Sequence, residues 1–242
     1  MADLVKLEKV GRVYILTMLG EGEHRLNEPM FEAIILALET VHKAEDAAAL
    51  VTTNEGRFYS NGLDMNWVKA QQFGKGVQSR YNLNTVLATL VNMNVPTIAA
   101  ICGHASAAGF IMALAHDHRC MRSDRGFLYM SEIDVQVRIP LGTMSLIRSS
   151  MSPKAFKDTV LLARKQTANE AYGAGIVDSV HQNSAETLKA AIAWATQLSK
   201  RGFSREFYRT MRLDMNPSVL QELVSGSTGT HLYPKHPILS KL

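Results

Sequence analysis

The sequence predicts an α/β fold, with layers of parallel strands and helices and a helical region towards the C-terminal end. Short apolar runs suited to buried strands alternate with segments whose apolar residues recur at helical spacing. Two of the runs lead into turns of glycine and other small residues, and a helical segment follows each turn. After about Pro140 the patterns become mostly helical. Alternating strands and helices favour parallel pairing, because the chain crosses over between successive strands.

Three short segments are predicted as strands. Residues 12–19 (RVYILTML) are rich in β-branched and aromatic residues, while residues 48–53 (AALVTT) and 97–102 (TIAAIC) are apolar runs of strand length. A helix is predicted between the first two strands, because Asn27 suits an N-cap and Pro29 falls in the first turn.

Further helices follow from apolar stripes and capping residues. Ser152 and Pro153 fit the start of a helix, and Thr167 with Glu170 fits a capping box. A stripe that ends before Pro96 comprises Leu83, Val86, Leu87, Leu90 and Val91. A later stripe comprises Leu188, Ala191, Ile192, Ala195 and Leu198.

Composition restricts the classes of function. The 242 residues are 46% hydrophobic, enough for one substantial core. Cys102 and Cys120 stand in apolar surroundings, which predicts buried thiols and a reducing compartment, not a disulfide or metal cluster. Residues 91–115 carry no formal charge, but Pro96 and Gly103 interrupt them, so no membrane span is expected. The N-terminal residues lack the apolar core of a signal peptide.

Basic side chains are concentrated near the C-terminal end. Residues 200–242 contain seven Lys and Arg against three acidic residues, which equals the chain's net charge of +4. This excess indicates either a site for a phosphorylated ligand or a solvated helix face. No basic run carries interleaved aromatic residues, so nucleic acid is not an expected partner.

The two small-residue turns are the main functional signal. Residues 56–67 (GRFYSNGLDMNW) follow one predicted strand, and residues 102–117 (CGHASAAGFIMALAHD) follow another and lead into a helix expected at about 110–115. Backbone N–H groups are unpaired at such strand–turn–helix junctions. Two of them facing one point would form an oxyanion hole, which stabilises negative charge on a carbonyl oxygen.

Both turns resemble signatures of one family. FYSNGLDM and ICGHASAAGFIMALAHDHR are similar to the first and second signatures of the crotonase, or enoyl-CoA hydratase/isomerase, superfamily, and TANEAYGAGIVDSV resembles a third element downstream. The resemblance implies an α/β crotonase-like ββα spiral core over residues 1–180, with a helical trimerisation region and exposed tail over residues 181–242. It also implies acyl-CoA thioester substrates, no metal or redox cofactor, and homotrimers or hexamers.

The resemblance also implies a set of site residues. The oxyanion donors would be the backbone N–H groups of Leu63 and Ala108. The adenine and pantetheine would lie along Tyr59–Asn61, and Arg25 would lie near the CoA phosphates. The full substrate-binding set comprises Arg25, Tyr59, Ser60, Asn61, Gly62, Leu63, Asp64, Ala108, Gly109 and Ile111.

Two positions bear on the chemistry. Ile111 stands where hydratases carry a catalytic glutamate, although hydration needs two groups that move protons. Glu132, in LYMSEIDVQVRIP, resembles the position of the second hydratase glutamate and of the base in one class of isomerases. Other isomerases carry the base near what are here Leu141 and Gly142. Asp134 is the nearest alternative carboxylate, and strand alternation would aim it the same way as Glu132.

One carboxylate with an oxyanion hole suits a Δ3,Δ2-enoyl-CoA isomerase of fatty-acid β-oxidation. Glu132 would move a proton from C2 of a 3-enoyl-CoA to C4, and Ile111 would exclude water and raise the pKa of the base. The alternatives are an enoyl-CoA hydratase, a dienoyl-CoA isomerase, which usually needs a second acid, and a non-catalytic acyl-CoA-binding member.

The remaining conspicuous residues divide into a targeting signal and structural groups. The C-terminal Ser240, Lys241 and Leu242 match a peroxisomal import signal, which predicts an import receptor as a partner. Asp64 and Asp117 are expected to cap or pair locally. The side chains interpreted as structural are His104, His116, Met65, Met112 and Met130, with the methionines filling the core or the acyl pocket.

Overall fold

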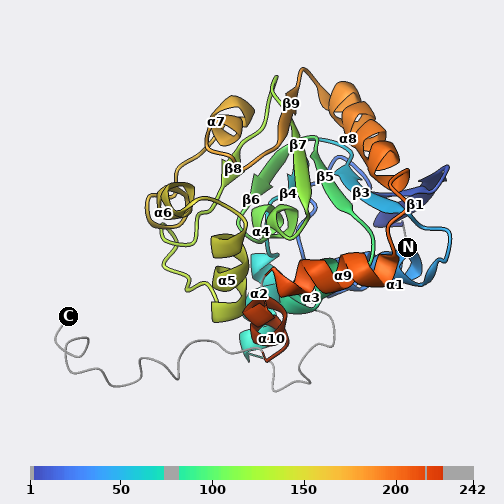
Figure 1. Cartoon of the computed structure of the whole chain (residues 1–242). Coiled ribbons are helices and arrows are strands. Elements are labelled where there is room, and N and C mark those ends of the chain that lie inside the picture. The colour runs from blue at the N-terminus through green and yellow to red at the C-terminus, as the bar shows by residue number, and fades with distance from the viewer. Residues whose placement is uncertain (1–2, 74–81, 216, 226–242) are drawn as a thin grey trace.

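Two sheets of mainly parallel strands form the framework of the protein (Figure 1). The computed structural model describes residues 3–73, 82–215 and 217–225. The larger, six-stranded sheet has the order β1 (Val5–Val10), β2 (Val13–Met18), β3 (Ala49–Asn54), β5 (Thr97–Ile101), β7 (His118–Arg122) and β9 (Ser179–His181). The smaller, three-stranded sheet has the order β4 (Phe58–Ser60), β6 (His104–Ser106) and β8 (Leu128–Tyr129). Among the described strands, β1 and β2 are the only neighbours that pair antiparallel, so the α/β prediction is confirmed.

The helices begin where the capping residues predict. The side chain of Asn27 accepts from Met30 N, and Thr167 with Glu170 forms a complete capping box. The helix expected at about 110–115 begins earlier, at Ala108. The first five helices are α1 (Glu28–Lys43), α2 (Met65–Phe73), α3 (Leu83–Val91), α4 (Ala108–Leu114) and α5 (Leu141–Ser149). The next five are α6 (Pro153–Leu161), α7 (Ala168–Gly173), α8 (Ser184–Ser199), α9 (Arg205–Asp214) and α10 (Pro217–Ser225).

The chain winds through repeated ββα units. In each unit one strand enters the larger sheet and the next enters the smaller sheet, as in the pairs β3–β4, β5–β6 and β7–β8. Helices α2, α4 and α5 are the first to follow these three pairs. Strands β4 and β6 are parallel neighbours, so their carboxyl ends meet at one edge of the smaller sheet. The two small-residue segments therefore contain these strands, and the chain turns at that edge after Ser60 and after Ser106.

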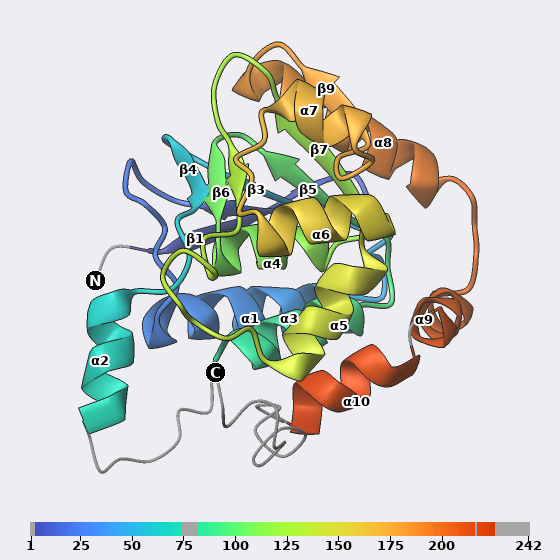
Figure 2. The same ribbon diagram turned by 90° about the vertical axis from the view of Figure 1, so that its left-hand side faces the viewer.

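The larger sheet is covered on both faces, which explains its apolar strands. Helix α8 packs on one face against residues such as Ile15, Val51 and Ile98. Helices α1, α3 and α4 contribute to the main core on the other face, and Figure 1 shows α8 on the opposite side of the sheet from α1 and α3. Figure 2 shows α2 beside the start of α1, at the periphery.

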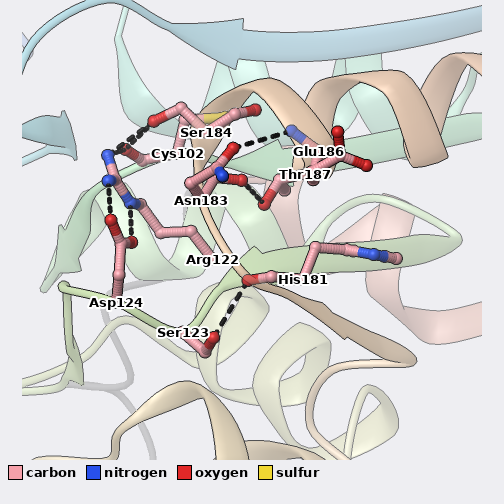
Figure 3. A network of polar contacts seen from close by, with 9 residues as sticks. All are labelled: Cys102, Arg122, Ser123, Asp124, His181, Asn183, Ser184, Glu186 and Thr187. Carbon is pink, nitrogen blue, oxygen red and sulfur yellow. Dashed lines mark hydrogen bonds and ion pairs between the residues drawn. The ribbon is translucent and has the colours of Figure 1, made fainter.

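A buried arginine fixes the chain just before the second turn (Figure 3). Arg122 is paired with Asp124, and its Nη1 donates to Cys102 O at 3.1 Å and to Ser184 Oγ. It therefore joins β7, the end of β5 and the start of α8. Cys102 and Cys120 are both buried free thiols, as predicted, and burial raises the pKa of Cys120 to about 11.

The C-terminal basic excess has a structural use that the sequence did not reveal. Three arginines of α9 donate to residues at the C-terminal ends of other helices. Arg205 donates to Ala44 O at 2.6 Å. Arg212 donates to Leu90 O at 2.6 Å and to Ala115 O at 3.0 Å. Arg209 donates to the side chain of Asn92 at 2.8 Å. Arg205 and Arg212 therefore bond within the fold and do not form a solvated face, while the phosphate site stays a prediction.

The C-terminal part is helical, as predicted. Helix α10 packs against α5 and α3. The division at residue 180 stays a prediction, and Ser240, Lys241 and Leu242 lie outside the described residues. Across the ranges that the structure describes, no helix is long and apolar enough to cross a membrane.

Candidate active site

The first turn aims a backbone N–H away from the segment to which it is bridged. Gly62 has a φ of +78°, which favours glycine. Leu26 N donates to Gly62 O at 2.9 Å, and Asp64 N donates to Leu26 O at 2.9 Å, as in a parallel bridge between Leu26 and Leu63. Because this bridge uses the two neighbours of Leu63, the N–H of Leu63 points to the opposite side.

Asp64 caps the helix that follows the first turn. Its carboxylate accepts from Asn66 N at 3.0 Å, Trp67 N at 3.3 Å and Asn27 Nδ2 at 3.3 Å. The hydrogen bond from Trp67 N and the one from Asn27 hold the pKa of Asp64 below its usual value. The expectation of a local capping role is confirmed.

The second turn ends at the first residue of α4. Ala107 has a φ of +48° and donates its N–H to Tyr129 O at 2.7 Å. Ala108 is the first residue of the helix, so no helical carbonyl precedes it to accept a hydrogen bond from its N–H. Gly109 is needed for packing, because a Cβ there would lie 2.3 Å from Ser60 O on β4. The α4 backbone therefore rests directly on the strand that leads to the first turn.

The two turns touch each other and face one cavity. A Cβ on Gly62 would lie 3.0 Å from Ala107 Cβ and 3.4 Å from Ala108 N. Among the described residues, neither Leu63 N–H nor Ala108 N–H donates a hydrogen bond within the chain. Both residues line a cavity of about 660 Å³.

Some of the predicted site residues line this cavity and others do not. The lining includes Arg25, Asn61, Leu63, Ala108, Ile111 and Glu132. The predicted residues that are not part of the lining are Tyr59, Ser60, Gly62, Asp64 and Gly109. Gly62 and Gly109 shape the backbone around the cavity, and Asp64 caps α2.

Tyr59 and Ser60 direct their side chains into the core. Both are fully buried. The Tyr59 hydroxyl shares a 2.7 Å hydrogen bond with Thr52 Oγ1, which lies 2.9 Å from His116 Nε2, and burial raises the pKa of Tyr59. Ser60 Oγ donates to His24 O at 2.8 Å. This leaves only their backbone for the predicted contact with CoA.

Glu132 lines the cavity with a carboxylate of which one oxygen is unpaired. Its Oε2 is buried and has no hydrogen-bond partner among the described residues. Burial raises the pKa of Glu132. Ile111, only 2% exposed, also lines the cavity. A poorly hydrated carboxylate therefore shares this space with hydrocarbon and with the two unpaired N–H groups.

The expected orientation of Asp134 is wrong. Residues 132–136 form turns, not a strand, so strand alternation does not apply. Val135 N donates to Ser131 O at 3.1 Å, and Val137 N donates to Glu132 O at 2.9 Å. Asp134 is exposed, accepts from the Tyr129 hydroxyl and is not part of the cavity lining.

The remaining expectations concern the methionines, His116 and a metal site. Met112 and Met130 are in the core, whereas Met65 is 46% exposed and lines the cavity. His116 is buried, which lowers its pKa to about 4. In the described part of the chain, no group of three or more His, Cys, Asp or Glu side chains could hold a metal ion.

Sequence reasoning missed cavity residues from α2 and from the segment before and within α5. Trp67, Arg138 and Thr143 all line the cavity. Arg25 lies there with its side chain 40% exposed, held by Glu23 at 2.7 Å and by Leu63 O at 3.3 Å. Nothing in the local sequence separates Trp67, Arg138 and Thr143 from their neighbours, because tertiary packing alone brings them together.

Comparisons with known proteins identify the family. The family model "Enoyl-CoA hydratase/isomerase" matches residues 21–232. Enoyl-CoA delta isomerase 1, peroxisomal, of Arabidopsis thaliana is 38% identical over 94% of this chain and 94% of that protein. Enoyl-CoA delta isomerase 2, peroxisomal, of the same plant is 36% identical over 88% of this chain and 92% of its own length.

A solved structure shows the same fold. The apo enoyl-CoA isomerase of Mycobacterium tuberculosis superposes with a TM-score of 0.82 at 20% identity, over 96% of this chain and 100% of that one. This likeness confirms the crotonase-like ββα prediction. The chain belongs to the enoyl-CoA hydratase/isomerase family.

Proposed function

We propose that the protein is a Δ3,Δ2-enoyl-CoA isomerase, which converts 3-enoyl-CoA to trans-2-enoyl-CoA in fatty-acid β-oxidation. The observation that carries the proposal is Glu132. Among the described residues that line the cavity, it is the only carboxylate, and it has a buried oxygen without a partner. The names of the two Arabidopsis relatives support the same activity.

The mechanism needs one base and an oxyanion hole. The thioester oxygen accepts from the N–H groups of Leu63 and Ala108. Glu132 takes a proton from C2, and the electron pair moves through the carbonyl carbon to give a dienolate. The two N–H groups stabilise the charge on the oxygen. The protonated Glu132 then returns the proton to C4, and the double bond forms between C2 and C3.

Burial prepares Glu132 for both halves of this transfer. A carboxylate with a raised pKa is a stronger base, and its protonated form is the acid needed for the second half. Ile111 contributes hydrocarbon where a second carboxylate would hold water, so hydration of the product is disfavoured.

Recognition of the CoA moiety follows from the open side of the cavity. The partly exposed Arg25 is suited to bind CoA phosphates, and the adenine and pantetheine are expected along the backbone of Tyr59 to Asn61, of which Asn61 lines the cavity. The acyl chain occupies the buried apolar part, which is lined by Phe31, Leu83 and Ile139 among others. Coenzyme A arrives with the substrate, so no separate cofactor is required.

A hydratase is the second candidate, because the family includes hydratases. Purified protein is to be supplied in parallel with a 3-enoyl-CoA and with a trans-2-enoyl-CoA. The proposal expects the absorbance of the conjugated thioester to rise with the first substrate and to persist with the second. A loss of absorbance with the second and no rise with the first would establish hydration instead. A non-catalytic acyl-CoA-binding protein would change neither signal.

Assembly and location complete the proposal. The protein forms homotrimers or hexamers through its helical C-terminal region, and light scattering that shows a strict monomer would contradict this.

It enters peroxisomes through Ser240, Lys241 and Leu242, in keeping with the names of both Arabidopsis relatives. A fluorescent fusion that preserves this C-terminus should overlap a peroxisomal marker, and removal of the three residues should leave it diffuse.

A further inference from the structure

Tyr129 connects the two halves of the candidate site. It is the last residue of β8 and lines the cavity. Its backbone O accepts from Ala107 N at 2.7 Å, and the next residue, Ala108, carries one N–H of the proposed oxyanion hole. Its hydroxyl donates to Asp134 Oδ2 at 2.5 Å, in the turn that begins at Glu132. One residue is therefore bonded both to the second small-residue turn and to the turn that carries the base.

A single hydrogen bond joins the base segment, residues 131–139, to the rest of the described chain. Backbone bonds such as that from Val137 N to Glu132 O, at 2.9 Å, lie within the base segment and fix its local shape. Among the residues that the structure describes, the bond from Tyr129 to Asp134 is the only hydrogen bond that reaches outside the segment. The placement of the base segment against β8 therefore depends on this hydroxyl.

Apolar packing holds the base segment only weakly. Ile133, Val135 and Val137 are 46%, 62% and 49% exposed, so much of their apolar surface stays in water and contributes no stabilisation. The partly buried Ile139 packs against the main core, but it stands at the far end of the segment from Glu132. Few other contacts can replace the hydrogen bond if it is removed.

The ring of Tyr129 is itself held in place. Lys165 Nζ lies 4.9 Å from the centre of the ring, within the distance of a cation–π interaction. The next residue, Gln166, exchanges two backbone hydrogen bonds of 2.9 Å with β8. The hydrogen bond to Asp134 raises the pKa of Tyr129, so the hydroxyl keeps its proton and remains the donor. The side chain is thus fixed on the sheet side and bonded to the base segment on the other.

We propose that Tyr129 is a positioning residue for the base: its hydroxyl, through Asp134, holds Glu132 in place relative to the oxyanion N–H groups. The inference rests on the proposed function, because it assigns Tyr129 a part in the proton transfer by Glu132. Displacement of a catalytic group by about 1 Å costs about 10²-fold in rate. The bonds within the base segment survive loss of the hydroxyl, so the productive position stays partly populated, and we expect a loss of about 10-fold in kcat.

Removal of the hydroxyl alone tests the inference. Tyr129→Phe keeps the ring that lines the cavity and loses the donor. Its kcat on a 3-enoyl-CoA should fall about 10-fold, while its affinity for a saturated acyl-CoA, measured by calorimetry, should match the wild type. A hydroxyl that bound the substrate directly would lose affinity instead. Tyr172→Phe, on α7 and outside the cavity lining, is the matched control and should leave both quantities unchanged.

Variants of Asp134 separate a tether from any other role. Asp134→Ala removes the acceptor and should lose as much kcat as Tyr129→Phe. Asp134→Asn keeps an acceptor oxygen, so it should retain the wild-type rate. The double variant Tyr129→Phe/Asp134→Ala should lose no more than either single variant, because both changes break the same bond. Hydrogen exchange of the amides in residues 131–139 should quicken in Tyr129→Phe and in Asp134→Ala but not in Asp134→Asn.

Three outcomes would overturn the inference: a wild-type kcat in Tyr129→Phe, losses that multiply in the double variant, and a fall in kcat that is matched by an equal fall in affinity. If the wild type isomerises a 3-enoyl-CoA and Tyr129→Phe does so equally fast, the inference fails and the proposed function stands. If the wild type binds acyl-CoA but isomerises no 3-enoyl-CoA, the proposed function fails and the inference fails with it.

Discussion

Replacement of Gly109 by alanine tests whether the packing of α4 on β4 holds the two N–H groups in place. The added Cβ would lie 2.3 Å from Ser60 O and 2.6 Å from Ser60 Cβ. Both distances are far below van der Waals contact, and the Ser60 oxygen is backbone that cannot rotate away. The helix or the strand must therefore move, by about 1 Å to restore a contact near 3.4 Å.

The magnitude follows from two opposing effects. Overpacking of a close contact costs roughly 1–3 kcal/mol, while glycine to alanine in a helix contributes roughly 1 kcal/mol of stability. The net loss is about 0–2 kcal/mol, which lowers the Tm by at most roughly 8 °C for a chain of this size. The activity should fall further, because a 1 Å displacement between Ala108 N and Leu63 N costs about 10²-fold in kcat/KM.

Thermal unfolding and isomerisation kinetics check this prediction against a matched control. Gly173 ends α7, and a Cβ there would meet nothing within 4 Å. Gly173→Ala should therefore leave activity unchanged and leave the Tm equal or slightly higher. The reasoning would be refuted if Gly109→Ala matched Gly173→Ala in both stability and kcat/KM.

Two further predictions concern charge. Because burial raises the pKa of Glu132 and the base must be ionised, kcat/KM for isomerisation should fall as the pH is lowered through that raised pKa, above the usual range of a glutamate. A pH profile measures this, and a rate that is flat down to the pKa of an exposed carboxylate would contradict it. Arg212→Leu should destabilise the fold by about 3–5 kcal/mol, because it leaves Asp117, 2.6 Å away and largely buried, without its ion-pair partner. Denaturant unfolding checks this beside Lys189→Leu on the exposed face of α8, and equal stability of the two variants would rule it out.

The sequence predicted the features that depend on local chemistry. Caps such as Asn27 and Thr167, and apolar runs such as residues 48–53, act over a few residues, and each appears where expected. The two turns were recognisable because glycine and other small residues mark close backbone approach. The approach of Gly109 to Ser60 is the physical reason for that composition.

The features that were missed depend on residues far apart in the chain. Arg205 and Arg212 look like surface charges in sequence, yet they bond to carbonyls more than ninety positions away. Asp134 was misplaced because residues 132–136 form turns where a strand was assumed. Thr143 could not be singled out, because only the packing of α5 shows that its hydroxyl is enclosed and unpaired.

The turnover of Glu132→Gln on a 3-enoyl-CoA tests the central claim most directly, with Asp134→Asn as the matched control. Both changes remove one carboxylate from the same turn, but only Glu132 lines the cavity. The rise in conjugated-thioester absorbance gives kcat, and calorimetry with a saturated acyl-CoA gives the affinity. We expect Glu132→Gln to lose about 10²-fold or more of kcat with its affinity retained, and Asp134→Asn to match the wild type. Unchanged turnover in Glu132→Gln, or its loss in Asp134→Asn instead, would contradict the assignment of Glu132 as the base.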